Sequence, residues 1–155
     1  MKTELVKDWM TGEVITISPD TTLPEAHKMM TDYAIRRLPV LDKNGRLVGI
    51  VTRGDVRGAQ PSTATTLSIW EMNYLLSRLK VEEMMTRQPV TIAKDATIGT
   101  AARLMLENHI SGLPVLDKHG RLAGILTESD IFRMIVIHEW GVEVNEDAKV
   151  AMTII

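Results

Sequence analysis

The hydrophobic pattern of the chain passes twice through the same series of spacings. In the first half, a short β-branched segment at 14–17 predicts a strand, and apolar residues at helical spacing follow from Leu23. Two apolar runs, at 38–41 and 47–51, flank an Asn-Gly turn and predict a β-hairpin. A further helix is expected after Thr52. Strand, helix, hairpin and helix together predict a small mixed sheet with helices on one side, an α/β (α+β) unit.

The second half repeats this pattern. The segment that begins at Leu38 reads LPVLDKNGRLVGIVTRGDV, and the segment that begins at Leu113 reads LPVLDKHGRLAGILTESDI. A shift of about 75 residues superposes 6–56 on 81–131 without a gap, with identity at roughly 23 of about 51 positions. Each copy is near the size at which a lone core is marginal, so the two units are expected to bury apolar surface against each other.

Local signals divide the chain further. Thr22 followed by Glu25 predicts a capping box at the first helix, and 90–92 is the second copy of the first strand. The stretch 58–66 has the Gly, Pro, Ser and Thr composition of a linker, and 67–79 predicts an extra helix. We therefore expect a first unit at 1–58, a linker with a helix at 59–80, a second unit at 81–138 and a tail with a turn near Asn145 at 139–155.

Composition limits the function. The chain has 155 residues, 45% of them apolar, a net charge of −2 and no cysteine. Disulfides, thiolate catalysis and cysteine metal sites are excluded, and the near-neutral charge argues against nucleic acid as a partner. No apolar stretch approaches the length of a membrane span, and Met1–Met10 lacks the apolar run of a signal peptide. We expect a cytoplasmic protein.

The repeated motifs resemble a tandem pair of cystathionine-β-synthase (CBS) domains. The matching features are a lead-in that ends in Met-Thr, a Leu-Pro-Val-Leu-Asp strand and a Gly-Ile-x-Thr-x-x-Asp junction between strand and helix, each present twice. The resemblance implies two domains related by a pseudo-two-fold axis, with two clefts that bind AMP, ADP, ATP or S-adenosylmethionine. It also implies a homodimer that regulates another protein and has no catalytic activity.

Two aspartates at the junctions are the main candidate site residues. Asp55 and Asp130 each lie in the first turn of an expected helix, where a carboxylate can accept hydrogen bonds from both ribose hydroxyls. The alternative role is an acid that the helix dipole favours at an N-terminus. Thr52 and Thr127 can bond ribose or phosphate, cap the helix, or do both.

The remaining wall of each site follows from the resemblance. It implies that backbone at Ile15 and Thr16, and at Thr91 and Ile92, lines the adenine. Val40 and Val115 would be apolar neighbours of the ligand, with core packing as the alternative role.

The halves differ most just before the Leu-Pro-Val strand and at the junction. The first half has Arg36, Arg37 and Arg53, whereas the second has Ser111, Gly112 and Glu128. Arginine's planar fork suits phosphate oxygens, so we expect the first site to take the more phosphorylated ligand. The second would be weaker, empty or nucleoside-like. A solvated basic surface is the alternative reading of the arginines.

The leading functional interpretation is a non-catalytic sensor that binds an adenosine ligand, with or without Mg²⁺, and needs no other cofactor. The alternative is a structural dimerisation module with vestigial clefts. No set of nucleophile, base and orienting residue suggests an enzyme, and the four histidines lack metal-ligand spacing.

Overall fold

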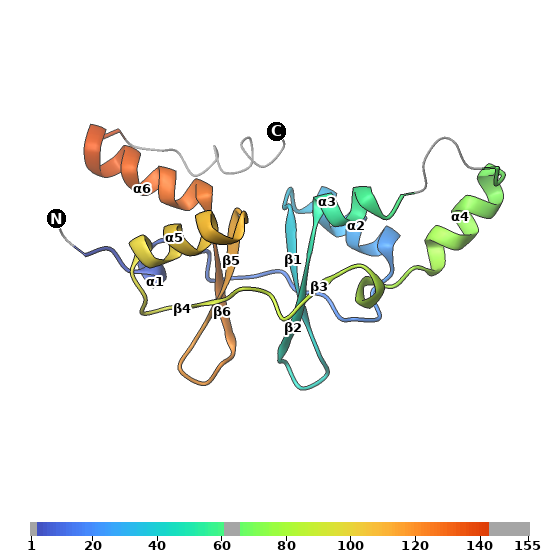
Figure 1. The fold of residues 1–155 in the computed structure, drawn as a ribbon, viewed down its shortest axis with the longest axis horizontal. Coiled ribbons are helices and arrows are strands. Elements are labelled where there is room, and N and C mark those ends of the chain that lie inside the picture. Colours follow the sequence, from blue (N-terminus) through green and yellow to red (C-terminus); the bar gives the residue numbers. More distant parts are fainter. Residues whose placement is uncertain (1–2, 61–65, 143–155) are drawn as a thin grey trace. The chain divides into compact units, whose positions relative to one another are not determined.

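The structure, a computed structural model, describes residues 3–60 and 66–142. These residues form two compact units, drawn as ribbons in Figure 1. The first-repeat unit contains 15–60 and 66–88, and the second-repeat unit contains 3–14 and 89–142. The expected turn near Asn145 and the apolar end of the chain lie outside the described residues.

The first-repeat unit follows the predicted order of elements. Its capping-box helix begins after Thr22, whose hydroxyl accepts from the backbone N–H of Glu25, and the extra helix is present as α4. The elements are α2 (Leu23–Asp32), β1 (Arg37–Leu41), β2 (Leu47–Thr52), α3 (Arg53–Gly58), α4 (Ile69–Arg78), the 3-10 helix η1 (Val81–Glu83) and β3 (Thr86–Arg87).

The second-repeat unit has the same hairpin and flanking helices. Its elements are α1 (Val6–Trp9), β4 (Ile92–Ala93), α5 (Ile98–Asn108), β5 (Gly112–Leu116), β6 (Leu122–Thr127) and α6 (Glu128–Trp140). Within the described residues each unit holds one three-stranded sheet, in the orders β1-β2-β3 and β4-β5-β6. Mixed α and β structure with two small sheets confirms the expected fold class.

The first strand of each repeat is shorter than the sequence predicts. The segment 14–17 is reduced to an isolated parallel bridge between Ile17 and Val40, in which Ile17 N–H donates to the Pro39 carbonyl at 3.0 Å. In the second repeat the strand β4 begins only at Ile92 and pairs in parallel with β5. Pro19 has no N–H to extend the pairing beyond Ile17, whereas in the second repeat Lys94 N–H donates to the Leu116 carbonyl at 3.0 Å and the strand continues to Ala93.

Each sheet is completed by the lead-in of the other repeat. Strand β3, which lies in the lead-in of the second repeat, pairs antiparallel with β2 through Ile50 and Thr86. At the equivalent place in the second-repeat unit, Thr11 forms an antiparallel bridge to Ile125. The two repeats therefore exchange lead-ins, so each compact unit contains residues from both halves of the chain.

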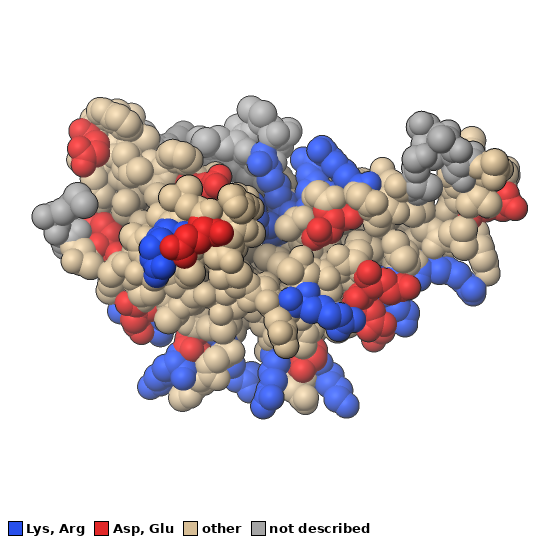
Figure 2. Space-filling view, viewed as in Figure 1, with Lys and Arg blue, Asp and Glu red and all other residues tan. Residues whose placement is uncertain are grey.

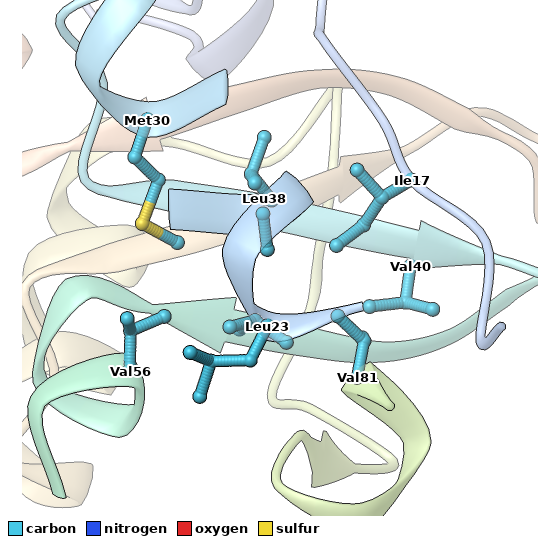
Figure 3. Close-up of a cluster of buried hydrophobic side chains, with 9 residues drawn as sticks. Ile17, Leu23, Met30, Leu38, Val40, Val56 and Val81 are labelled. Atoms are coloured by element: carbon cyan, nitrogen blue, oxygen red, sulfur yellow. The ribbon is translucent and has the colours of Figure 1, made fainter. Parts of the chain in front are cut away.

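The exchanged lead-ins are held by equivalent backbone hydrogen bonds from the first residues of α1 and η1. Val6 N–H donates to the Ala96 carbonyl at 2.9 Å, and Val81 N–H donates to the Thr21 carbonyl at 2.8 Å. Both valines are fully buried. Figure 3 shows Val81 among the side chains from α2, α3 and β1 that form the core of the first-repeat unit. The lead-in is thus part of the core on which the site described below rests.

Candidate functional site

The open end of the β1–β2 hairpin, opposite its turn, brings the basic candidate residues of the first repeat together. Arg37 pairs with Thr52 in the antiparallel register, and Arg53 N–H donates to the Arg36 carbonyl at 2.8 Å. Helix α3 begins at Arg53, directly after Thr52. On the face shown in Figure 2, Lys and Arg side chains gather over β1 and α3. Three guanidinium-bearing residues therefore flank the N-terminus of one helix.

Asp55 and Thr52 cap this helix. Thr52 N–H donates to Asp55 Oδ2 at 2.8 Å, and Asp55 N–H donates to Thr52 Oγ1 at 3.1 Å. The capping role expected for Thr52 is thus confirmed. Asp55 is half-buried, and its second oxygen, Oδ1, has no hydrogen bond to the described residues. A carboxylate held on one oxygen and available on the other can accept from a ligand hydroxyl.

The second repeat has the same backbone arrangement with different chemistry. Gly112 pairs with Thr127, and Glu128 N–H donates to the Ser111 carbonyl at 3.1 Å. Gly112 is buried, and the junction carries an exposed acid in place of Arg53. The predicted asymmetry in charge is therefore present at equivalent places of the two sheets.

Asp130 is more enclosed than Asp55 and more fully bonded. It is 4% exposed, and its Oδ2 accepts from both Thr127 N–H and Thr127 Oγ1–H, at 2.9 and 3.1 Å. Its Oδ1 lies 3.4 Å from Arg133 Nη2. Both oxygens of this carboxylate are engaged within the unit.

Arg133 also contacts the N-terminal helix. Its Nη2 donates to the Trp9 carbonyl at 3.3 Å, and its guanidinium carbon lies 5.9 Å from the centre of the Trp9 ring. The sequence comparison of the repeats missed both residues. Position 133 corresponds to Gly58, just beyond the superposed segment, and the difference between glycine and arginine there was the available signal.

The expected adenine wall lies on the parallel edge of each sheet. Ile15 packs against the core of the first-repeat unit, while Ile92 belongs to the core of the second. Thr16 and Thr91 are half-buried. Only their backbone and partial side-chain surface are available to a ligand.

Val40 and Val115 have no exposed surface. The core-packing role considered for both valines is therefore present in the structure. Any contribution of these positions to a ligand site comes through the neighbouring backbone.

Two other classes of site receive no support. Among residues 3–60 and 66–142, no three His, Asp or Glu side chains come together as a possible metal site. Within the same ranges, no helix is long and apolar enough to cross a membrane.

The family model of the CBS domain matches the chain twice, over residues 6–62 and 81–137. The chain belongs to the CBS domain family. A CBS domain-containing protein of Dictyostelium discoideum is 40% identical over 132 residues, which cover 85% of this chain and 91% of that protein. Several curated relatives named as enzymes are much longer, and this CBS pair spans only 21% to 24% of their length.

Solved CBS pairs have the same fold. The CBS pair of protein MJ0100, in complex with 5′-methylthioadenosine and S-adenosylmethionine, has a TM-score of 0.71 at 32% identity. The match covers 86% of this chain and 96% of that one. The protein CBSX2 in complex with AMP has a TM-score of 0.72 at 30% identity, covering 88% and 98%. Members similar to this chain thus bind adenosine compounds.

Proposed function

We propose that this CBS pair is a regulatory module that binds adenosine-containing ligands, and that it is not an enzyme. The observation that carries the proposal is the open end of the β1–β2 hairpin, where Asp55 caps α3 with one carboxylate oxygen and where Arg36, Arg37 and Arg53 lie at the same end of the strands. The adenosine ligands of the solved relatives support it.

The candidate residues form three groups, one each for the ribose, the adenine and the phosphates of the ligand. Asp55 and Thr52 accept and donate hydrogen bonds at the ribose diol, and backbone near Ile15 and Thr16 lines the adenine. Arg36, Arg37 and Arg53 bind phosphate oxygens. In the second repeat Thr91, Ile92, Thr127 and Asp130 take the corresponding roles, without the arginines.

The two repeats are proposed to prefer different ligands. AMP, ADP or ATP suits the first repeat because its arginines neutralise phosphate, whereas Glu128 would repel phosphate at the second. The enclosed Asp130 makes the second site weaker, or selective for a nucleoside or S-adenosylmethionine. A bound Mg²⁺ would accompany the triphosphate only.

Regulation requires that the ligand bind two arrangements of the protein with different affinity. The homodimer, the regulated partner protein and the cytoplasmic location implied by the family belong to this proposal. Exposed apolar residues on α4, with Trp70 at 84% and Ile69 at 70% exposure, offer one surface for such a partner.

Calorimetric titration with AMP, ATP and S-adenosylmethionine tests the proposal. Asp55→Asn should remove the phosphorylated-ligand site and Asp130→Asn the other, while Arg37→Ala should weaken ATP more than AMP. A bound nucleotide at ~100 times its dissociation constant should stabilise the fold by about 2.7 kcal/mol. Two equal sites for AMP and ATP, or an unchanged ATP affinity in Arg37→Ala, would contradict the asymmetry.

The second candidate is a structural dimerisation module with vestigial clefts. It is favoured by the capping bonds of Asp55 and Asp130, which give both aspartates a role without any ligand. Native mass spectrometry of protein purified without added ligand separates the two functions. A dimer with no co-purifying adenosine compound, and no thermal shift with those tested, would support the structural module.

A further inference from the structure

Arg133 occupies a junction between the candidate second site and the N-terminal helix. Its Nη2 lies 3.4 Å from Asp130 Oδ1 and 3.3 Å from the Trp9 carbonyl oxygen. The Arg133 side chain is 17% exposed and that of Asp130 is 5% exposed. One guanidinium nitrogen therefore reaches both the candidate ribose acceptor on α6 and the last residue of α1.

The guanidinium is only partly satisfied in this position. Its Nε is buried and has no hydrogen-bond partner among the described residues. A buried unpaired donor costs free energy, so this arrangement of Arg133 is poised to change when its partners change. Asp130 is one of those partners, and a ligand hydroxyl would compete for the same Oδ1.

The Trp9 side chain is held by Glu4 and His138 of the second-repeat unit. Its indole Nε1–H donates to Glu4 Oε2 at 2.8 Å, and its ring makes an edge contact with His138 at 5.6 Å between centroids. His138 Nε2 in turn lies 3.2 Å from Glu4 Oε1. A displacement of Arg133 would therefore change the surroundings of the Trp9 indole, which Glu4 and His138 hold in place.

The first repeat lacks this connection. Position 58, which corresponds to Arg133, is glycine, and a Cβ added there would meet no atom within 4 Å. Among the described residues, Asp55 consequently has no equivalent link to a lead-in. The difference makes the coupling a property of the second repeat alone.

We propose that Arg133 is a positioning residue that couples Asp130 to Trp9, so that occupation of the second site changes the environment of the N-terminal helix α1. The ligand part rests on the proposed function, since it requires a ribose at Asp130. The coupling itself is a property of the ligand-free protein. A coupling of this kind is reciprocal, so changes at Trp9 must alter affinity at Asp130 by the same factor.

The ligand-free arm follows the Trp9 indole N–H by nuclear magnetic resonance. The other tryptophans, Trp70 and Trp140, are 84% and 67% exposed and are replaced by Phe so that one indole signal remains. Asp130→Asn should shift the Trp9 signal, and this shift should be absent when Arg133 is Met. When Arg133 is replaced by Lys, which keeps the charge but not the planar fork, Asp130→Asn should shift the Trp9 signal by a smaller amount than it does with Arg133 present. An unmoved Trp9 signal in Asp130→Asn overturns the coupling.

The ligand arm uses AMP and S-adenosylmethionine, followed by Trp9 fluorescence and by calorimetry. The change in Trp9 fluorescence should saturate as ligand fills the site at Asp130, and should be lost in Asp130→Asn. It should not respond to filling of the site at Asp55, and should be retained in Asp55→Asn. Arg133→Met should abolish this response and change affinity at the second site by about fivefold, at the lower end of measured couplings. The matched control is Arg103→Met, an exposed arginine on α5 in the same unit.

The two proposals fail differently. Absence of heat with every adenosine compound would refute the proposed ligand function, while the ligand-free shift would still decide the coupling. Ligand binding at Asp130 with a Trp9 response that persists in Arg133→Met would overturn the role of Arg133 and leave the proposed function standing.

Discussion

Met10 lies directly against Gly124 in the second-repeat unit. A Cβ built on Gly124 would be 2.6 Å from Met10 Sδ and 2.6 Å from the Thr11 carbonyl oxygen. In the first-repeat unit a Cβ on Gly49 would likewise be 2.5 Å from Met85 Sδ. The Met-Thr of each lead-in thus fits over the glycine of the other repeat's hairpin.

We expect Gly124→Ala to displace the lead-in, because the Thr11 carbonyl is backbone and cannot rotate away as the Met10 side chain can. The free energy of unfolding should fall by about 1–3 kcal/mol, the usual cost of overpacking. Urea unfolding measures this change. The control is Gly12→Ala, since a Cβ there meets nothing within 4 Å. Equal stabilities of the two variants would contradict the proposed fit.

The repeat, the hairpins and the helix caps could be predicted because each depends on neighbouring residues. Thr22 with Glu25, and the hairpin turn at Asn44 and Gly45, are signals within four residues, and the structure confirms them. The exchange of lead-ins could not be predicted in this way. Nothing near Met10 indicates that its glycine partner is Gly124, more than 100 residues away.

The candidate site shows the same limit. Register placed Arg37 beside Thr52, as the hairpin pattern implies. The contact of Arg133 with Trp9 joins residues 124 positions apart and follows only from the exchange. The degree of burial, which distinguishes Asp130 from Asp55, likewise depends on tertiary packing and has no local signature.

Ala34→Gly should stabilise the protein. Ala34 ends the turn after α2 with φ of 51°, a left-handed conformation that costs a residue with a Cβ roughly 1–2 kcal/mol and costs glycine little. Part of this gain is offset by the greater entropy of glycine in the unfolded chain, so we expect a net increase of about 0.5–1 kcal/mol in thermal or urea unfolding. Ala59→Gly, where φ is −79°, is the matched control and should destabilise. A loss of stability in Ala34→Gly would contradict the argument.

Glu25 should contribute stability that disappears in acid. The Thr22 N–H donates to Glu25 Oε2 at 2.9 Å, and this bond lowers the pKa of the Glu25 carboxyl below its usual value. A pKa that is lower in the folded state means that the contribution is fully present above the unfolded value of about 4.3 and is lost as the pH falls through the folded pKa. Wild type should therefore exceed Glu25→Gln in urea midpoint near about pH 7, and the difference should shrink toward about pH 3.

Glu13→Gln is the control for this measurement, because Glu13 is an exposed carboxylate outside the helix caps. Its effect on the urea midpoint should be small. A difference between wild type and Glu25→Gln that grows on acidification would show that the capping carboxylate is not the cause.

Asp130→Asn should destabilise the protein more than Asp55→Asn. Both changes weaken a helix cap, which costs about 1 kcal/mol. Asp130 in addition loses the charge that faces the largely buried Arg133, and a polar group left without its partner inside the fold costs roughly 1–3 kcal/mol more. Urea unfolding of both variants without ligand measures the difference, and Asp130→Asn combined with Arg133→Met should recover part of the loss. Equal losses in Asp130→Asn and Asp55→Asn would mean that Arg133 draws no stabilisation from Asp130, and the two aspartates would then be equivalent caps despite their different burial.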